Sequence, residues 1–199
     1  MTLPNEIIVY IFKENDILGR EERLIRAAQL YCQGISCASG EERVGECIDK
    51  ARFQVEKTPL GKPYFSQARE LHFSISHSGA YWACAVADYP VGLDLQVRRK
   101  KYSFRIAERF FHPDEKTYLL GNGDFYAVWT AKESYVKYTG TGIGEGFDRF
   151  AVADETGMLN YVKIQGDCGP ELRMTEIIEN YCCCICAEVI GEVIFRKNA

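Results

Sequence analysis

Asp94 is the acidic residue whose surroundings in the sequence point most directly to chemistry. It lies in the segment Gly92-Leu93-Asp94-Leu95-Gln96, among apolar neighbours. An ionised carboxylate in such a place needs a cation or strong hydrogen-bond donors. A divalent metal ion would meet that need, and the alternative is an aspartate at the end of a strand that simply faces water.

Glu133 and Lys137 form a second candidate pair, spaced by four residues. We expect a helix over residues 124–138, capped by an aspartate and stopped by the glycines at 140–142. On that helix Trp129, Glu133 and Lys137 share one face. The spacing alone favours an ordinary surface ion pair, an interpretation that the aromatic and apolar neighbours weaken without removing it.

Hydroxyl, imidazole and ammonium groups come together in two further segments. Ser76 and His77 stand where an alternating strand over residues 71–76 gives way to a turn, a common place for groups that bind phosphate. A serine-rich turn can also be simply a hydrogen-bonded loop. Lys62 follows a glycine and precedes a proline, so a stiff turn could present its ammonium group to a phosphate.

The composition limits the class of protein. With 199 residues, of which 47% are hydrophobic, the chain can form one compact unit, and its net charge of −4 argues against a nucleic-acid partner. We find no run of 18 apolar residues and no signal-peptide pattern, so we expect a cytoplasmic protein without a membrane span. The nine cysteines are expected to be reduced, and those at 182, 183, 184 and 186 alternate along a strand and cannot surround one zinc ion.

Hydrophobic periodicity and turn residues predict the elements that position these side chains. Strands are expected over 6–12, 71–76, 81–87, 91–96, 147–152 and 159–164, with extended structure over 177–195. Helices are expected over 20–32, ended by Gly34, and over 106–111, 113–120 and 124–138. Residues 35–52 are ambiguous, with a short helix over 41–50 as one interpretation, and 58–63 must form a loop because two prolines and a glycine disrupt regular structure.

A weak internal repeat appears at an offset of 100 residues. Tyr81, Cys84 and Ala87 recur as Tyr181, Cys184 and Ala187. The repeat indicates either a duplicated α+β unit or a coincidence between two buried strands.

Taken in order, four segments resemble the surfactin-type 4′-phosphopantetheinyl transferases: 61–63 (GKP), 73–78 (FSISHS), 92–95 (GLDL) and 129–137 (WTAKESYVK). The resemblance covers about residues 20–150. It implies an α+β fold of two similar halves with pseudo-twofold symmetry in one chain, here 1–97 and 98–199. It also implies transfer of phosphopantetheine from coenzyme A to a serine of an acyl or peptidyl carrier protein, with release of adenosine 3′,5′-bisphosphate.

The resemblance assigns roles to individual residues. Asp94 and Glu133 are expected to bind magnesium or manganese, and Lys137 to lie beside the reacting phosphate. Lys62, Ser76 and His77 are expected to contact coenzyme A, and Arg23 on the first helix to contact a phosphate. The base that receives the serine proton is open between Glu133 and a metal-bound water.

Gln96 departs from the pattern of many relatives, which carry a second acid at this position in an Asp-x-Glu motif. An amide is a poorer magnesium ligand than a carboxylate. We therefore expect weaker magnesium dependence or a different metal preference, with the Gln96 carbonyl or water filling the position.

Two rival classes stay open. One is a non-catalytic module that binds coenzyme A or a carrier protein, in which Gln96 marks a weakened metal site. The other is a different magnesium-dependent phosphoryl or nucleotidyl transferase, although the sequence has no G-x-x-x-x-G-K-[ST] loop.

The resemblance also bears on partners. Carrier proteins of this family are typically acidic, so the basic segments 98–101 and 105–109 are expected docking regions, although a basic run is also typical of a solvated face. Because both halves would lie in one chain, we expect a monomer to contain the whole site.

Overall fold

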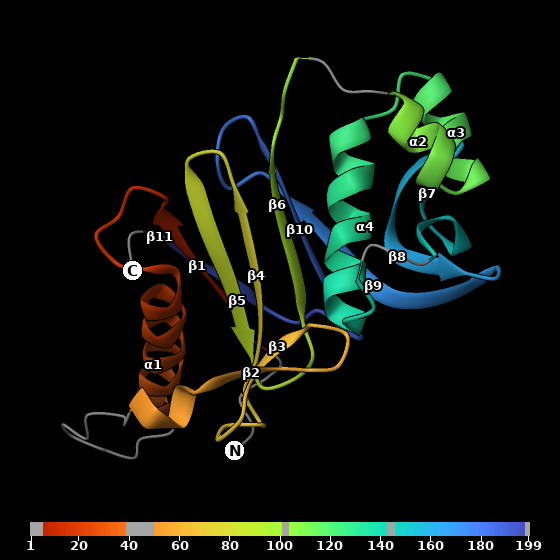
Figure 1. Ribbon diagram of the computed structural model, residues 1–199. Helices are drawn as coiled ribbons and strands as arrows, with labels where there is room; N and C mark the ends of the chain where they lie inside the picture. The colour runs from red at the N-terminus through yellow and green to blue at the C-terminus, as the bar shows by residue number, and fades with distance from the viewer. Residues whose placement is uncertain (1–5, 39–49, 101–103, 143–145, 198–199) are drawn as a thin grey trace.

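Two sheets share a central core, and each carries a long helix on its outer face (Figure 1). The computed structural model describes residues 6–38, 50–100, 104–142 and 146–197. Helix α1, Arg20–Ala38, covers the first sheet and helix α4, Phe125–Thr139, covers the second. The α+β class expected from the sequence is confirmed.

The sheets are built as follows. The first has the order β11-β1-β5-β4 and consists of β11 Val193–Lys197, β1 Ile7–Lys13, β5 Tyr81–Ala87 and β4 His72–Ser78. The second has the order β6-β10-β9-β8-β7 and consists of β6 Gly92–Val97, β10 Tyr181–Ala187, β9 Asp167–Thr175, β8 Gly157–Ile164 and β7 Phe150–Asp154. The remaining elements are η1 Lys50–Phe53, the hairpin β2 Val55–Lys57 and β3 Pro63–Phe65, helices α2 Phe104–Phe110 and α3 Pro113–Leu120, and η2 Phe147–Arg149.

The periodicity arguments hold best where caps mark the ends of an element. Asp124 caps α4 by accepting hydrogen bonds from the backbone N–H groups of Tyr126 and Ala127, and Gly140 ends the helix in the left-handed region at φ 78°. The predicted strand over 81–87 and helix over 113–120 are also confirmed.

Four local predictions are wrong, and one strand was not predicted. Gly34 does not end α1, which continues to Ala38. Residues 147–149 form a 3₁₀ turn before β7, and extended structure over 177–195 is interrupted, giving β10 and β11 in different sheets. Strand β9 was missed, because Gly169 and Pro170 within it are unfavourable in a strand. The loop over 58–63 ends one residue early, where β3 begins. The interpretation of 41–50 as a helix falls outside the described residues, except at Lys50.

Serine hydroxyl groups join the two sheets along β4 and β6. Alternate residues of β4 point toward β6, as the strand period requires. The hydroxyl oxygens of Ser74, Ser76 and Ser78 accept hydrogen bonds from the backbone N–H groups of Leu93, Leu95 and Val97, at 2.9, 3.0 and 3.0 Å. These side chains take the place of a backbone ladder, so the edges of the two sheets meet at the strand that carries Asp94.

Each sheet contains strands from both expected halves. Strand β6 pairs with β10, and β11 runs parallel to β1. The division at residue 97 thus cuts between elements of one sheet, and it stays a prediction.

Helix α4 packs very closely on the start of β6. A Cβ atom at Gly92 would lie 2.0 Å from the Ser134 carbonyl oxygen and 2.6 Å from the Tyr138 backbone nitrogen. Both atoms belong to the backbone of α4, so the helix itself would have to move.

We therefore predict that Gly92→Ala lowers the free energy of unfolding by about 3 kcal/mol or more, because it forces α4 away from β6. Gly34→Ala is the control. No atom lies within 4 Å of a Cβ built there, so alanine should stabilise α1 by about 0.5–1 kcal/mol. Chemical denaturation measures both, and unchanged stability in Gly92→Ala would contradict the close approach.

Candidate active site

Asp94 is a buried carboxylate in which one oxygen accepts two hydrogen bonds and the other accepts none from the described residues. Its Oδ1 accepts hydrogen bonds from Ser76 Oγ and from Lys137 Nζ, both at 2.7 Å. The residue is 5% exposed, and its Oδ2 is buried and has no hydrogen-bond partner among the described residues. The alternative of a strand-end aspartate facing water is therefore wrong.

Glu133 lies beside Asp94 on the inner face of α4 and is 7% exposed. Burial and the negative charge of Asp94 raise the pKa of Glu133 to about 7, against the opposing effect of Lys137. Lys137 forms its ion pair with Asp94. The alternative of a surface ion pair between Glu133 and Lys137 is thus also wrong, because Glu133 is buried and Lys137 pairs with Asp94 on β6.

Ion pairs and hydrogen bonds hold both ends of α4. At its start, the capping carboxylate of Asp124 pairs with Arg98, which directly follows β6. At its end, Lys62 Nζ donates a hydrogen bond to the Tyr138 carbonyl oxygen at 2.6 Å. Burial lowers the pKa of Lys62. Both contacts fix the helix that carries Glu133 and Lys137.

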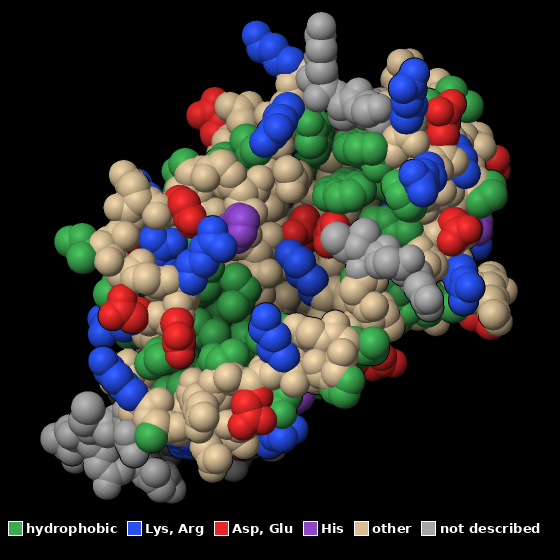
Figure 2. Space-filling model, in the orientation of Figure 1, with side chains coloured by type: hydrophobic (Ala, Val, Ile, Leu, Met, Phe, Trp, Pro, Cys, Tyr) green, Lys and Arg blue, Asp and Glu red, His purple; other side chains and the backbone are tan. Residues whose placement is uncertain are grey.

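An open cavity of about 360 Å³ lies next to these charged groups. Leu60, Pro63, Phe73, Ile75 and Val136 contribute its apolar lining, and Lys62, Glu133 and Lys137 its charged lining. Figure 2 shows a hollowed face on which cationic side chains surround apolar and acidic ones. The cavity could therefore hold a molecule with both apolar and anionic parts.

The other predicted site residues are placed differently. His77 is exposed on β4, and Gln96 is half-buried two residues beyond Asp94, on the same face of β6. Arg23 is buried on α1, where its guanidinium donates to a Glu14 carboxylate oxygen at 3.2 Å and to the Glu14 carbonyl oxygen at 2.9 Å. The structure thus brings together Ser76, Asp94, Glu133 and Lys137, with Lys62 lining the same cavity as the last two, whereas the described contacts of Arg23 lie elsewhere.

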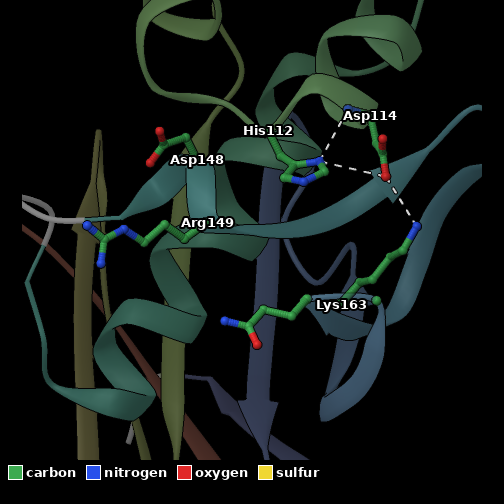
Figure 3. A pocket seen from close by; sticks show the side chains of 7 residues that line it. His112, Asp114, Asp148, Arg149 and Lys163 are labelled. Carbon is green, nitrogen blue, oxygen red and sulfur yellow. Dashed lines mark hydrogen bonds and ion pairs between the residues drawn. The ribbon is translucent and has the colours of Figure 1, made fainter.

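A second cavity, of about 470 Å³, lies near the start of α3 (Figure 3). His112, Asp114, Asp148, Arg149 and Lys163 line it, and Lys163 forms an ion pair with Asp114 at 3.2 Å. It contains none of the predicted site residues.

Comparison with known proteins agrees with this geometry. A family model for the 4′-phosphopantetheinyl transferase superfamily matches residues 90–186, the stretch from just before β6 to β10 that includes Asp94 and α4. Over this stretch the chain is similar to that superfamily. The resemblance inferred from the four sequence segments is therefore confirmed.

Individual superfamily members show similar levels of identity. A 4′-phosphopantetheinyl transferase of Bacillus subtilis is 33% identical over 149 residues, which cover 70% of this chain and 65% of the relative. The 4′-phosphopantetheinyl transferase Sfp of Bacillus subtilis strain 168 is 35% identical over 111 residues, covering 53% and 49%. The 4′-phosphopantetheinyl transferase gsp of Aneurinibacillus migulanus is 32% identical over 138 residues, covering 66% and 56%. The matches thus span from about half to nearly two thirds of the length of these relatives.

The acidic residues of the site fit a hard metal ion, although the thiols of the neighbouring strand do not. Within the described ranges, no three His, Cys, Asp or Glu side chains form a ready metal-binding cluster. Cys183 faces the core between the sheets, whereas Cys184 and Cys186 face α4. Asp94, with its free buried Oδ2, and neighbouring Glu133 are oxygen donors of the kind magnesium prefers, and further ligands could come from a substrate and water.

In the part of the chain that the structure describes, none of the helices is both long and apolar enough to cross a membrane.

Because Glu133 has a raised pKa in the folded state, we predict that the metal-free protein loses stability as the pH rises. Its pKa changes from 4.5 in the unfolded chain to about 7 in the folded one. The neutral form is thus favoured by folding, and this contribution is present below pH 4.5 and lost as the pH passes 7. The loss should be on the order of 3 kcal/mol.

Glu133→Gln should remove this slope and be the more stable protein at pH 8. Denaturation curves at several pH values, with chelator present, measure the effect. Glu155→Gln, on an exposed turn, is the control and should keep the wild-type slope. If stability depended on pH in Glu133→Gln as it does in the wild type, the raised pKa of Glu133 would not be the cause of that dependence.

Proposed function

We propose that this protein is a 4′-phosphopantetheinyl transferase that moves phosphopantetheine from coenzyme A to a serine of an acyl or peptidyl carrier protein. The observation that carries the proposal is the meeting of Asp94, Glu133 and Lys137 at the seam between the sheets, within the region that matches the superfamily. In the reaction the serine oxygen bonds to the phosphorus that carries pantetheine. The bond from that phosphorus to the bridging oxygen breaks, and adenosine 3′,5′-bisphosphate leaves.

The charge of each side chain determines its role in the proposed reaction. A magnesium or manganese ion held by Asp94 and Glu133 would neutralise charge on the pyrophosphate. Lys137, whose side chain is 29% exposed, can offer a proton or positive charge to the leaving oxygen. Glu133, a buried carboxylate beside Asp94, can receive the serine proton directly or through water.

The adjoining cavity supports coenzyme A as the donor. Phe73, Ile75 and Val136 offer apolar contacts, while Lys62 and Lys137 bring positive charge to the same space. A nucleotide with a pantetheine arm presents both kinds of surface. Contacts of His77 and Arg23 with coenzyme A stay part of the proposal.

We also propose two similar halves related by a pseudo-twofold axis. The antiparallel pairs β1–β5 and β5–β4 of the first sheet match β6–β10 and β10–β9 of the second, and α1 and α4 follow β1 and β6 along the chain. The repeat-related Tyr81 and Tyr181 stack edge to face, 5.3 Å apart. This correspondence supports a boundary between β5 and β6 better than one at residue 97.

The protein partner in this proposal is an acidic carrier protein, which a cytoplasmic monomer binds. Exposed Arg99, Arg105 and Arg109 supply positive charge, and Phe110, 40% exposed, adds apolar surface on α2. Lys101 lies outside the described residues. None of the described cysteines forms a disulfide, which fits a reducing compartment.

Incubation with coenzyme A, magnesium and apo carrier proteins tests the proposal, with intact-mass spectrometry to detect phosphopantetheine on the acceptor serine. We expect an adduct with wild type and at least a roughly 100-fold lower rate with Asp94→Asn or Glu133→Gln, because each loses a carboxylate of the metal site. Asp167→Asn, an exposed change, should retain full activity.

The outcomes separate the rivals. Full activity in Asp94→Asn or Glu133→Gln would contradict the assigned roles. Binding of coenzyme A without an adduct on several carriers would favour the non-catalytic module.

Gln96→Glu should lower the magnesium concentration needed for half-maximal transfer about tenfold, because it adds a carboxylate two residues from Asp94 on the same face of β6. Magnesium titration of the initial rate measures this. Gln67→Glu, which adds the same charge at an exposed position, should leave the titration unchanged. An unaltered midpoint in Gln96→Glu would show that residue 96 does not reach the metal.

A further inference from the structure

Lys132 and Glu115 form an ion pair that is completely buried. Both side chains are 0% exposed, and Lys132 Nζ lies 2.8 Å from Glu115 Oε1. The same ammonium group donates to the Phe150 carbonyl oxygen at 2.8 Å and lies 4.1 Å from the centre of the Phe150 ring. Lys132 thus points away from the cavity and ties α4 to α3 and β7.

The Glu115 carboxylate connects further backbone groups. Its Oε1 also accepts a hydrogen bond from the Val152 N–H on β7, and its Oε2 accepts one from the His112 N–H at the start of α3, both at 2.9 Å. Asp114, next to Glu115, pairs with Lys163 on β8, so α3 is itself held to the second sheet (Figure 3). Glu115 therefore gives α4 a fixed point on the sheet.

Stability alone does not explain this pair. Taking two charges out of water costs so much that apolar side chains of similar volume often stabilise a protein equally well. A charged pair with several hydrogen bonds does, however, fix the direction in which its side chains point. Apolar contacts fix that direction less sharply. Here the direction matters because Lys132 immediately precedes Glu133.

The helix geometry links the pair to the active site. Successive side chains on a helix point about 100° apart, so fixing Lys132 toward β7 sets the direction of Glu133 toward Asp94. Lys137 lies one turn beyond Glu133 and reaches Asp94 Oδ1 at 2.7 Å. The cap at Asp124 and the bond from Lys62 hold the ends of α4, whereas the Lys132 contact fixes the rotation of its middle.

We propose that the Glu115–Lys132 pair positions α4 so that Glu133 and Lys137 face Asp94 during phosphopantetheine transfer. Both residues are positioning residues that act through the helix. This inference rests on the proposed function and adds to it the residues that hold the site in register.

The test is the neutral double variant Glu115→Gln/Lys132→Met. Removing both charges avoids leaving one of them buried alone, and the glutamine carbonyl can still accept from a backbone N–H of Val152 or His112. We expect kcat to fall roughly 10- to 100-fold, because small displacements of reacting groups are costly, while the KM for coenzyme A changes little. Val162→Ala, which opens a space in the same core, controls for lost stability and should keep its kcat at a temperature where it is folded.

A crystal structure of the double variant tests the geometry of the site independently of enzymatic activity. The Lys137 Nζ to Asp94 Oδ1 contact, 2.7 Å in wild type, should lengthen or disappear. Wild-type kcat in the folded double variant, or an unchanged contact, would overturn the proposal. If the double variant does not fold, Lys132→Met is measured in the same two ways, with the same deciding outcomes, because Glu115 can then take up a proton and stay uncharged.

The two proposals fail separately. If wild type itself forms no adduct, the proposed function fails, and the crystal structures still decide whether the pair sets the position of α4.

Discussion

The two hydrogen bonds to Asp94 Oδ1 are the constraint on which the arrangement of the molecule depends. Ser76 comes from β4 at the edge of the first sheet, Lys137 comes from α4, and Asp94 itself lies on β6 at the edge of the second sheet. A buried carboxylate without such donors would be severely destabilising. Ser76 and Lys137 supply these donors from β4 and α4, so the packing of both elements against β6 also assembles the site.

The site carries an electrostatic cost that a purely structural core would avoid. Asp94 and Glu133 are both buried, and burial together with the charge of Asp94 raises the pKa of Glu133 to about 7. Lys137 offsets part of the negative charge, but Asp94 Oδ2 has no partner in the described part of the chain. Perturbed acids of this kind concentrate at functional sites, because a bound cation can supply the missing charge.

Sequence reasoning succeeded where the signal is local and failed where the partner is distant. The limits of α4 could be predicted because Asp124 and Gly140 cap it directly. The burial of Lys132 could not, since its partner Glu115 lies on another helix and nothing in the spacing distinguishes it from a surface lysine. Motif order identified Asp94, Glu133 and Lys137, whereas only the fold revealed that Ser76 contacts Asp94 directly.

The contacts that Lys62 and Arg23 make in the structure decide whether each can also bind a phosphate of coenzyme A. Lys62 donates one hydrogen bond to the end of α4, where the helix dipole favours a cation, and an ammonium group has two further donors for a phosphate in the cavity it lines. Arg23 already faces the carboxylate of Glu14, whose negative charge opposes a phosphate. Lys62 can thus bind coenzyme A and keep its bond to α4, whereas Arg23 can do so only if Glu14 is displaced.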